Sequence, residues 1–285
     1  MYNKKLIGFF LIALILAGCI GTASASENTT FTSANEEKTF TDIQIAIDYA
    51  SENDTIELEG TYKSQGNAIE VNNDLTFKGA NDATLDGNWS SRIINTDKNL
   101  IFKDITFQNA LSSEYGGAIK SSGDLTFINC IFKGNNIKSM PDYYWYYGSA
   151  IYGEGKLTIV NCTFTDNLGD SAIRADVIDL KNSKFINNPA NNAVNGNKVT
   201  IDNCDFQNNS VAVYDAVELK IKNSRFNKNE FGIYVFSYCT LDVDNCSFTN
   251  NSETAMYASC DSTVSNSRFE NNRKGIRAYS SYISS

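Results

Sequence analysis

Apolar and polar residues alternate in short segments that recur along most of the chain. In one of them Leu219 and Ile221 are apolar whereas Lys220 and Lys222 are charged, and this period of two predicts a strand with one buried face. Each copy continues with an Asn, a Phe three residues later, and a second Asn three residues after the Phe. The Phe positions are Phe132, Phe164, Phe185, Phe206, Phe226, Phe248 and Phe269, with a weaker copy at Phe107.

The spacing of these Phe residues defines the size of the repeat. Successive intervals from Phe132 onward are 32, 21, 21, 20, 22 and 21 residues. A period near 21 is too short for a pair of helices and suits one turn of a β-solenoid. We therefore predict an all-β fold, a single-stranded parallel β-helix in which each copy forms one coil and the Phe side chains stack inside.

The first Asn of each copy falls where the coil must turn a corner. Asn tolerates a positive φ better than other residues that carry a side chain. Stacked coils would align these amides in a hydrogen-bonded ladder at the inter-strand spacing of ~4.8 Å. The residue after it is Cys or Ser, small enough for a crowded corner. The predicted ladder consists of Asn129, Asn161, Asn182, Asn203, Asn223, Asn245 and Asn266.

The cysteines follow from this register. Most corner cysteines lie two coils apart, too far for a disulfide. Cys130 and Cys162, and likewise Cys239 and Cys260, are neighbours in register, so either pair could be bonded, although buried thiols are the simpler interpretation. No CxxC pair and no His accompanies them, and we expect no metal site and no cofactor.

The first 25 residues have the pattern of an export signal, with Lys4 and Lys5 before an apolar stretch and a small-residue site at Ala23–Ala25. Alternatively, the segment ending at Cys19 is similar to a lipobox, so that residues 1–18 would be removed and Cys19 lipidated. We favour cleavage after Ala25. In both cases we expect an extracellular or cell-surface protein. Its one membrane contact would be a lipid at Cys19, in the second case only.

The mature chain divides into two further regions. Residues 26–40 are polar and predict a flexible linker, and residues 41–285 carry the β-helix. Thr41 is the expected N-cap of a helix over 41–52 that lies on the first coil through Ile43, Ala46, Ile47 and Ala50. The long interval after Phe132 predicts an insertion loop near 136–147.

The segment Gly116–Ile119, followed by Phe132-Lys133-Gly134-Asn135, resembles the GGAI and FxxN pair of the polymorphic outer membrane protein repeat. Residues 40–87 resemble the opening of adhesin-like surface proteins of methanogenic archaea. The resemblance implies a pectin-lyase-like right-handed parallel β-helix on a cell surface, and it implies no assigned chemistry.

Charge and composition narrow the possible functions. The formal net charge of −9 argues against a nucleic-acid partner, and the absence of His removes the commonest general base. A polysaccharide lyase or hydrolase of this fold would need carboxylates set apart in a cleft. Asp202 and Asp244 instead alternate with Lys181 and Lys222 in successive coils, which favours a charge ladder that sets the register. We expect no catalytic residue.

Exposed aromatic residues are the better functional candidates. The residue after each buried aliphatic of the GGAI-derived strand should face solvent, and in several coils it is Tyr. We predict a non-enzymatic adhesin-like protein that binds a surface glycan or another surface protein, the alternative being a carbohydrate-active enzyme. The candidate binding residues are Tyr152, Tyr214, Tyr234 and Tyr257, and in the insertion loop Tyr143, Tyr144, Trp145, Tyr146 and Tyr147.

Overall fold

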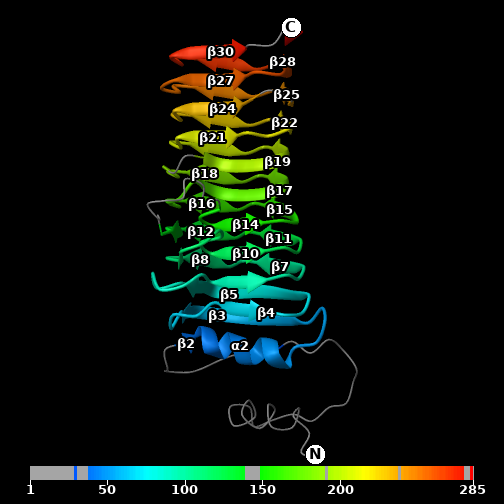
Figure 1. The fold of residues 1–285 in the computed structure, drawn as a ribbon, viewed down its shortest axis with the longest axis vertical. Coiled ribbons are helices and arrows are strands. Elements are labelled where there is room, and N and C mark those ends of the chain that lie inside the picture. Colours follow the sequence, from blue (N-terminus) through cyan, green and yellow to red (C-terminus); the bar gives the residue numbers. More distant parts are fainter. Residues whose placement is uncertain are drawn as a thin grey trace, which may run out of the picture.

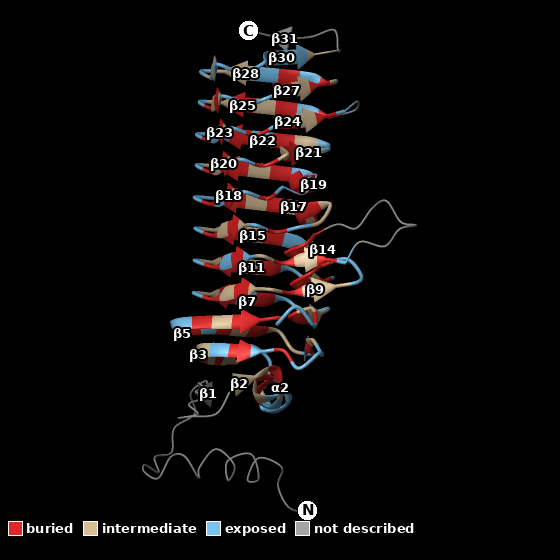
Figure 2. Cartoon of the chain, turned by 90° about the vertical axis from the view of Figure 1, so that its left-hand side faces the viewer, coloured by how far each residue is buried: buried red, intermediate tan, exposed pale blue. Residues whose placement is uncertain are grey.

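In the computed structural model, parallel strands wind into a right-handed β-helix of about 11 turns, and helix α2 (Phe40–Tyr49) covers its N-terminal end (Figure 1). This confirms the all-β solenoid. Each coil contributes strands to three faces, named here A, B and C, and buried residues point inward on all of them (Figure 2). The residues that the structure describes are 29–30, 38–138, 148–189, 192–236, 239–278 and 283–284.

Face A is a parallel sheet that runs the length of the solenoid. Its strands pair in order from the N-terminal coil to the C-terminal coil, and the first parts of β17 and β19 belong to it. The strands are β4 (Ile69–Val71), β6 (Ile94–Thr96), β10 (Ile119–Ser121), β14 (Ile151–Gly153), β17 (Ser171–Lys181), β19 (Asn192–Asp202), β21 (Val211–Tyr214), β24 (Phe231–Val235), β27 (Thr254–Ala258) and β30 (Lys274–Ala278).

Face B carries the alternating Leu-x-Phe or Leu-x-Ile segments that define the repeat. It includes the second parts of β17 and β19, because these two strands continue through the corner from face A. Its other strands are β1 (Thr29–Thr30), β3 (Thr55–Lys63), β5 (Leu75–Asp86), β7 (Leu100–Lys103), β11 (Leu125–Ile128), β15 (Lys156–Val160), β22 (Glu218–Lys222), β25 (Thr240–Asp244), β28 (Asp261–Ser265) and β31 (Ile283–Ser284).

Face C holds the short strands centred on the repeated Phe, together with the ends of β3 and β5. Outside the main sheet, β9 (Leu111–Ser112) pairs with β13 (Asn136–Ile137) where two coils are longer than the rest. The strands of face C are β2 (Lys38–Thr39), β8 (Thr106–Gln108), β12 (Ile131–Lys133), β16 (Thr163–Thr165), β18 (Lys184–Ile186), β20 (Asp205–Gln207), β23 (Arg225–Asn227), β26 (Ser247–Thr249) and β29 (Arg268–Glu270).

The repeated Phe residues stack inside the solenoid. From Phe107 to Phe269 the ring centroids of neighbours lie 4.6 to 5.0 Å apart, and the rings are within 10° of parallel. A second, shorter stack joins Phe77, Phe102 and Phe127 of face B in the N-terminal coils. Each ring therefore lies against its equivalent one coil away, which fixes the register of the coils.

The predicted corner asparagines lie between faces B and C, with φ between 49° and 56°. Their side chains are exposed, and the ladder is interrupted. The Asn161 amide donates to Asn129 at 2.7 Å, and the Asn203 amide donates to Asn182 at 2.8 Å. The Asn223 amide, however, donates to the carboxylate of Asp202, at 2.7 Å. Asp202 therefore takes part in the corner ladder as an acceptor, although the backbone register also places it between Lys181 and Lys222.

The second Asn of each repeat forms a continuous, buried ladder that the sequence did not reveal. Each side-chain amide donates to the next Asn Oδ1, at distances from 2.7 to 3.3 Å, and to the carbonyl of the repeated Phe of an earlier coil. The buried ladder runs through Asn135, Asn167, Asn188, Asn209, Asn229, Asn251 and Asn272.

Helix α2 begins at Phe40, one residue before the expected start at residue 41. Its N-cap is Thr39 and not Thr41, because the Asp42 carboxylate accepts a hydrogen bond from the Thr39 backbone N–H at 2.7 Å. The helix buries Phe40 beside the predicted apolar face. The side chain of Gln44 pairs with both backbone groups of Glu70 at 2.9 and 3.0 Å, so it satisfies an edge of the first coil that would otherwise be open.

Candidate ligand-binding face

One outward-facing residue per coil forms a column along face A, as the repeat predicts. The strand register pairs each member with its equivalent in the next coil. At ~4.8 Å for each strand-to-strand step, the column is roughly 43 Å long. The members of this outward column are Glu70, Asn95, Lys120, Tyr152, Arg174, Asn195, Tyr214, Tyr234, Tyr257 and Arg277.

Three tyrosines occupy consecutive coils near the C-terminal end of the column. The ring centroids of Tyr214 and Tyr234 are 6.0 Å apart and those of Tyr234 and Tyr257 are 4.5 Å apart, and both pairs are stacked. The guanidinium of Arg277 lies 5.6 Å from the Tyr257 centroid and covers its outer face. The ring faces are turned toward one another, and the three tyrosines are half-buried, so the accessible part of the stack consists of ring edges.

Two phenylalanines enlarge this patch. Phe231 and Phe236 each meet Tyr234 edge-on at 5.1 Å, and Phe236 also meets Tyr214 at 5.7 Å. Phe236 is 38% exposed. Together Tyr214, Phe231, Tyr234, Phe236 and Tyr257 are called the aromatic cluster. Sequence reasoning missed Phe231 and Phe236 because they lie at the two ends of β24 and outside the periodic position.

The strand β24 approaches β27 closely at Gly232. A Cβ placed there would lie 2.4 Å from the Ala255 carbonyl oxygen, so glycine is required for this pairing. Just beyond β24, Cys239 is joined to Cys260 by a disulfide, with their Cα atoms 5.3 Å apart. The disulfide links the two coils that carry Tyr234 and Tyr257.

Of the two cysteine pairs left open by the sequence, one is bonded and one is not. The preference for buried thiols is wrong for Cys239 and Cys260 and agrees with the structure for Cys130 and Cys162, which are free. The Cys130 backbone N–H donates to Cys162 Sγ at 3.3 Å, and burial raises the pKa of the Cys130 thiol. In the later coils the same corner contact is made by a Ser hydroxyl, which explains the alternation of Cys and Ser.

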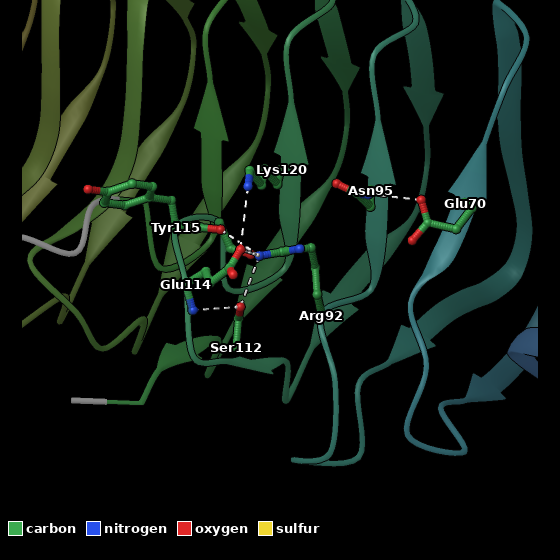
Figure 3. Close-up of polar contacts among 8 residues, drawn as sticks. Glu70, Arg92, Asn95, Ser112, Glu114, Tyr115 and Lys120 are labelled. Atoms are coloured by element: carbon green, nitrogen blue, oxygen red, sulfur yellow. Dashed lines mark hydrogen bonds and ion pairs between the residues drawn. The ribbon is translucent and has the colours of Figure 1, made fainter. Parts of the chain in front are cut away.

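Toward the N-terminal coils the outward column becomes charged (Figure 3). The Asn95 amide donates to the Glu70 carboxylate at 2.8 Å. The Lys120 ammonium lies 3.4 Å from the Glu114 carboxylate, which belongs to an insertion between faces C and A. From the same insertion Tyr115 stacks on the column residue Tyr152, with centroids 4.9 Å apart.

Arg92 holds this insertion in place (Figure 3). Its guanidinium donates to the Tyr115 and Gly116 carbonyls, each at 2.8 Å, and to the Ser112 hydroxyl at 3.0 Å. Burial lowers the pKa of Arg92, although the group remains a cation, and Glu114 lies 3.9 Å from it. The half-buried Arg92 cation, with three hydrogen-bond acceptors in the insertion, restrains its conformation.

Lys120 and Tyr152, the two column residues that the insertion contacts, also line a shallow hollow on face A of about 340 Å³. Glu70, Asn95, Lys120, Tyr152 and Glu154 line it. Within the described ranges no group of His, Cys, Asp and Glu side chains has the arrangement of a metal site.

The remaining candidate residues are not among those that form the aromatic cluster or line the hollow. Asn195 belongs to the outward column but is only 4% exposed, contrary to the expectation that it faces solvent, because its short side chain lies between Arg174 and Tyr214 in register. The aromatic residues of the insertion loop, Tyr143, Tyr144, Trp145, Tyr146 and Tyr147, fall outside the described residues, as does Cys19. Within the described residues the structure has no helix long and apolar enough to cross a membrane.

Comparisons with known proteins concern the fold. The family profile of the right-handed β-helix region matches residues 169–285, and no curated protein matches the chain. The chain is similar to the PL6 family alginate lyase AlyGC at 13% identity and a TM-score of 0.46, covering 90% of this chain and 39% of the lyase. It is also similar to PfbA, a surface adhesin of Streptococcus pneumoniae, at 14% identity and a TM-score of 0.38, covering 87% of this chain and 93% of PfbA. This chain thus spans about two fifths of the length of the lyase, and neither likeness indicates a function.

Proposed function

We propose that this protein is an exported, non-enzymatic surface β-helix that binds a linear, hydroxyl-rich polysaccharide through the aromatic cluster. The observation that carries the proposal is the cluster itself: five aromatic side chains gathered on one sheet, three of them half-buried tyrosines. Phenol groups combine an apolar ring edge with a hydroxyl that can donate or accept, which suits a sugar that offers both C–H and O–H groups.

Export is supported by two independent features. The N-terminal sequence has the pattern of a signal peptide, with lipidation at Cys19 as the alternative form of surface attachment. The Cys239–Cys260 disulfide also suits an exported protein, since disulfides persist in oxidising compartments.

A non-enzymatic role is supported by the position of the acidic residues. Asp244 accepts hydrogen bonds from Asn266 and Ser265, each at 2.8 Å, and these bonds hold its pKa below the ordinary value. Asp205 pairs with Arg225 at 3.2 Å. Carboxylates engaged in this way contribute to coil register and are poorly suited to proton transfer.

The test is binding to a panel of linear glucan, xylan and mannan polysaccharides. Replacing Tyr214, Tyr234 and Tyr257 together with Ala should weaken binding by more than about tenfold. Replacing the same three with Phe keeps the stack and removes the hydroxyls, so a similar loss is expected if the hydroxyl edge makes the contact. The matched control changes Lys220, Asp242 and Thr263 to Ala, because these residues face solvent from face B in the same three coils.

Three results would overturn the proposal. Absence of binding to every polysaccharide of the panel would reject the function, and undiminished binding by the triple Ala variant would reject the site. Release of reducing or unsaturated sugars during incubation would show that the protein is an enzyme.

A further inference from the structure

We infer that the hollow beside Lys120 and Tyr152 is a second subsite for the same polysaccharide, so that the ligand is an extended chain lying along the solenoid axis. The inference rests on the proposed function of the aromatic cluster and adds a site and an orientation to it. It follows from how the hollow is built, from its chemistry, and from its alignment with the cluster.

Two side chains that line the hollow are held by a departure from the repeat. The coil between Phe107 and Phe132 contains 25 residues, more than the period near 21, and the excess forms β9 and the turn that carries Glu114 and Tyr115. Arg92 fixes this turn through three hydrogen bonds. From the turn Glu114 pairs with Lys120 and Tyr115 stacks on Tyr152, so these two lining side chains are preorganised. A preorganised site loses less conformational entropy when a ligand binds.

The side chains of the hollow include both hydrogen-bond donors and acceptors. Lys120 and Asn95 are donors, with the Asn95 amide bonded to Glu70, and the carboxylates of Glu70, Asp97 and Glu154 are acceptors. Tyr115 is 37% exposed and its stack on Tyr152 supplies an apolar surface beside these groups. Because the charge of Lys120 is already balanced by Glu114 at 3.4 Å, the hollow suits an uncharged, hydroxyl-rich sugar better than an anion.

The hollow and the aromatic cluster lie on one line. Tyr152 pairs with Arg174, Arg174 with Asn195, and Asn195 with Tyr214, so three strand-to-strand steps of ~4.8 Å separate the two aromatic sites by roughly 14 Å. Both sites therefore face the same direction from the same sheet. A linear polymer laid along face A reaches both, whereas a disaccharide reaches only one.

Two linked subsites predict a dependence of affinity on chain length. Once an oligomer spans both sites, the second contact becomes intramolecular, and the gain in affinity should be at least about tenfold, within the range for linked sites. The measurement is calorimetric titration with size-fractionated glucan, xylan and mannan oligomers, from dimers to octamers.

A variant with Lys120→Gln and Tyr152→Ala removes the second subsite alone. It should bind dimers as the unaltered protein does and should lose the gain shown by octamers. The matched control is Thr126→Ala with Thr158→Ala, since these residues are the outward neighbours on face B in the same two coils. Unchanged circular dichroism would establish that both variants are folded.

The outcomes separate the two proposals. Affinity that is independent of chain length, or an octamer affinity that survives in the Lys120/Tyr152 variant, overturns the second subsite while the aromatic cluster stands. Absence of binding to every oligomer and polymer of the three series overturns both proposals. Loss of octamer binding on altering Lys120 and Tyr152, with no effect of altering the aromatic cluster, overturns the proposed function at the cluster.

Discussion

The buried asparagine ladder should contribute far more to stability than the exposed corner residues next to it. Asn209 is 3% exposed, and its Nδ2 donates to the Phe185 carbonyl at 2.9 Å and to Asn229 Oδ1 at 3.0 Å. Its Oδ1 accepts from the backbone N–H and the side-chain amide of Asn188, at 3.1 and 3.0 Å. Asn209→Ala therefore removes four hydrogen bonds from the interior.

The expected loss follows from the groups left without a partner. The Asn188 backbone N–H and one Asn188 amide hydrogen would remain buried and unsatisfied, whereas the Phe185 carbonyl keeps its partner in the strand ladder. At about 1–3 kcal/mol for each of these two groups, the free energy of unfolding should fall by roughly 2–6 kcal/mol. That is a large share of the stability of an ordinary domain.

The adjacent Asn208 provides a matched control. It is exposed, has a φ of 55°, and its amide donates to Asn187 at 2.6 Å. Glycine accepts this φ, so Asn208→Gly should cost less than about 1 kcal/mol. The measurement is urea unfolding followed by circular dichroism, with hydrogen exchange to locate the opening. If the free energy of unfolding falls equally in the two variants, the second Asn is not the main source of side-chain hydrogen bonds between coils.

The isosteric variant Asn209→Asp adds a pH test. A carboxyl group at this position would keep the acceptors for Asn188 but would face the Phe185 carbonyl and Asn229 Oδ1 without a donor. Burial would raise its folded-state pKa above the unfolded value, so the folded state binds the proton more tightly. Stability of Asn209→Asp should therefore fall as the pH rises through the unfolded pKa of about 3.9 and toward the folded one. A stability that rises over the same interval would contradict the reasoning.

Three further predictions concern the C-terminal coils. Replacing Cys239 and Cys260 with Ser should lower stability by about 2–4 kcal/mol, and a reductant should lower the melting temperature of the unaltered protein but not of this variant. Burial raises the pKa of the Cys204 thiol to about 12, so a thiol reagent at neutral pH should modify it only after unfolding, as mass spectrometry would show. The hydrogen bond with the Lys220 ammonium holds the pKa of Glu218 below its ordinary value. The Glu218 carboxylate therefore stabilises the fold at pH values above its pKa in the unfolded chain, and this stabilisation is lost as the pH falls through its lower pKa in the folded protein. Lys220→Met should raise the Glu218 pKa in a titration followed by NMR.

The coil could be predicted from the sequence because its determinants repeat. Alternating apolar residues and the regular Phe spacing require the same packing in every coil, so each copy supports the interpretation of the others. The outward position of Tyr214, Tyr234 and Tyr257 followed from the same period, since a strand turns successive side chains to opposite faces.

The choice between the two asparagines could not be made from spacing alone, because both recur with the same period. A signal was nevertheless present. The residue before the buried Asn is itself variable, with Gly134, Asp166, Asn187 and Lys228 in different coils, and each adopts a positive φ. A position that accepts several residue types in this conformation marks an exposed turn, and the invariant Asn after it then points inward.

The candidate site was less predictable because its distinctive parts are not periodic. The clamp of Arg92 on the turn at Tyr115 and the position of Phe236 depend on insertions and strand ends that occur once. The N-cap error at Thr41 has the same origin: two threonines lie at the start of the helix, and the Asp three residues after Thr39 decides between them.

Stability and binding are carried by different residues of the same coil, and this division has a physical consequence. The inward Phe and the second Asn contact their equivalents in both neighbouring coils, so a change in one coil disturbs three. A residue of the outward column such as Tyr234 also stacks on its equivalents, but it is half-buried, so another side chain in its place leaves the interior contacts intact. Face A can therefore vary coil by coil while the interior stays fixed, which accounts for a regular interior beneath a column that changes from charged residues at Glu70 and Lys120 to aromatic ones at Tyr214 and beyond.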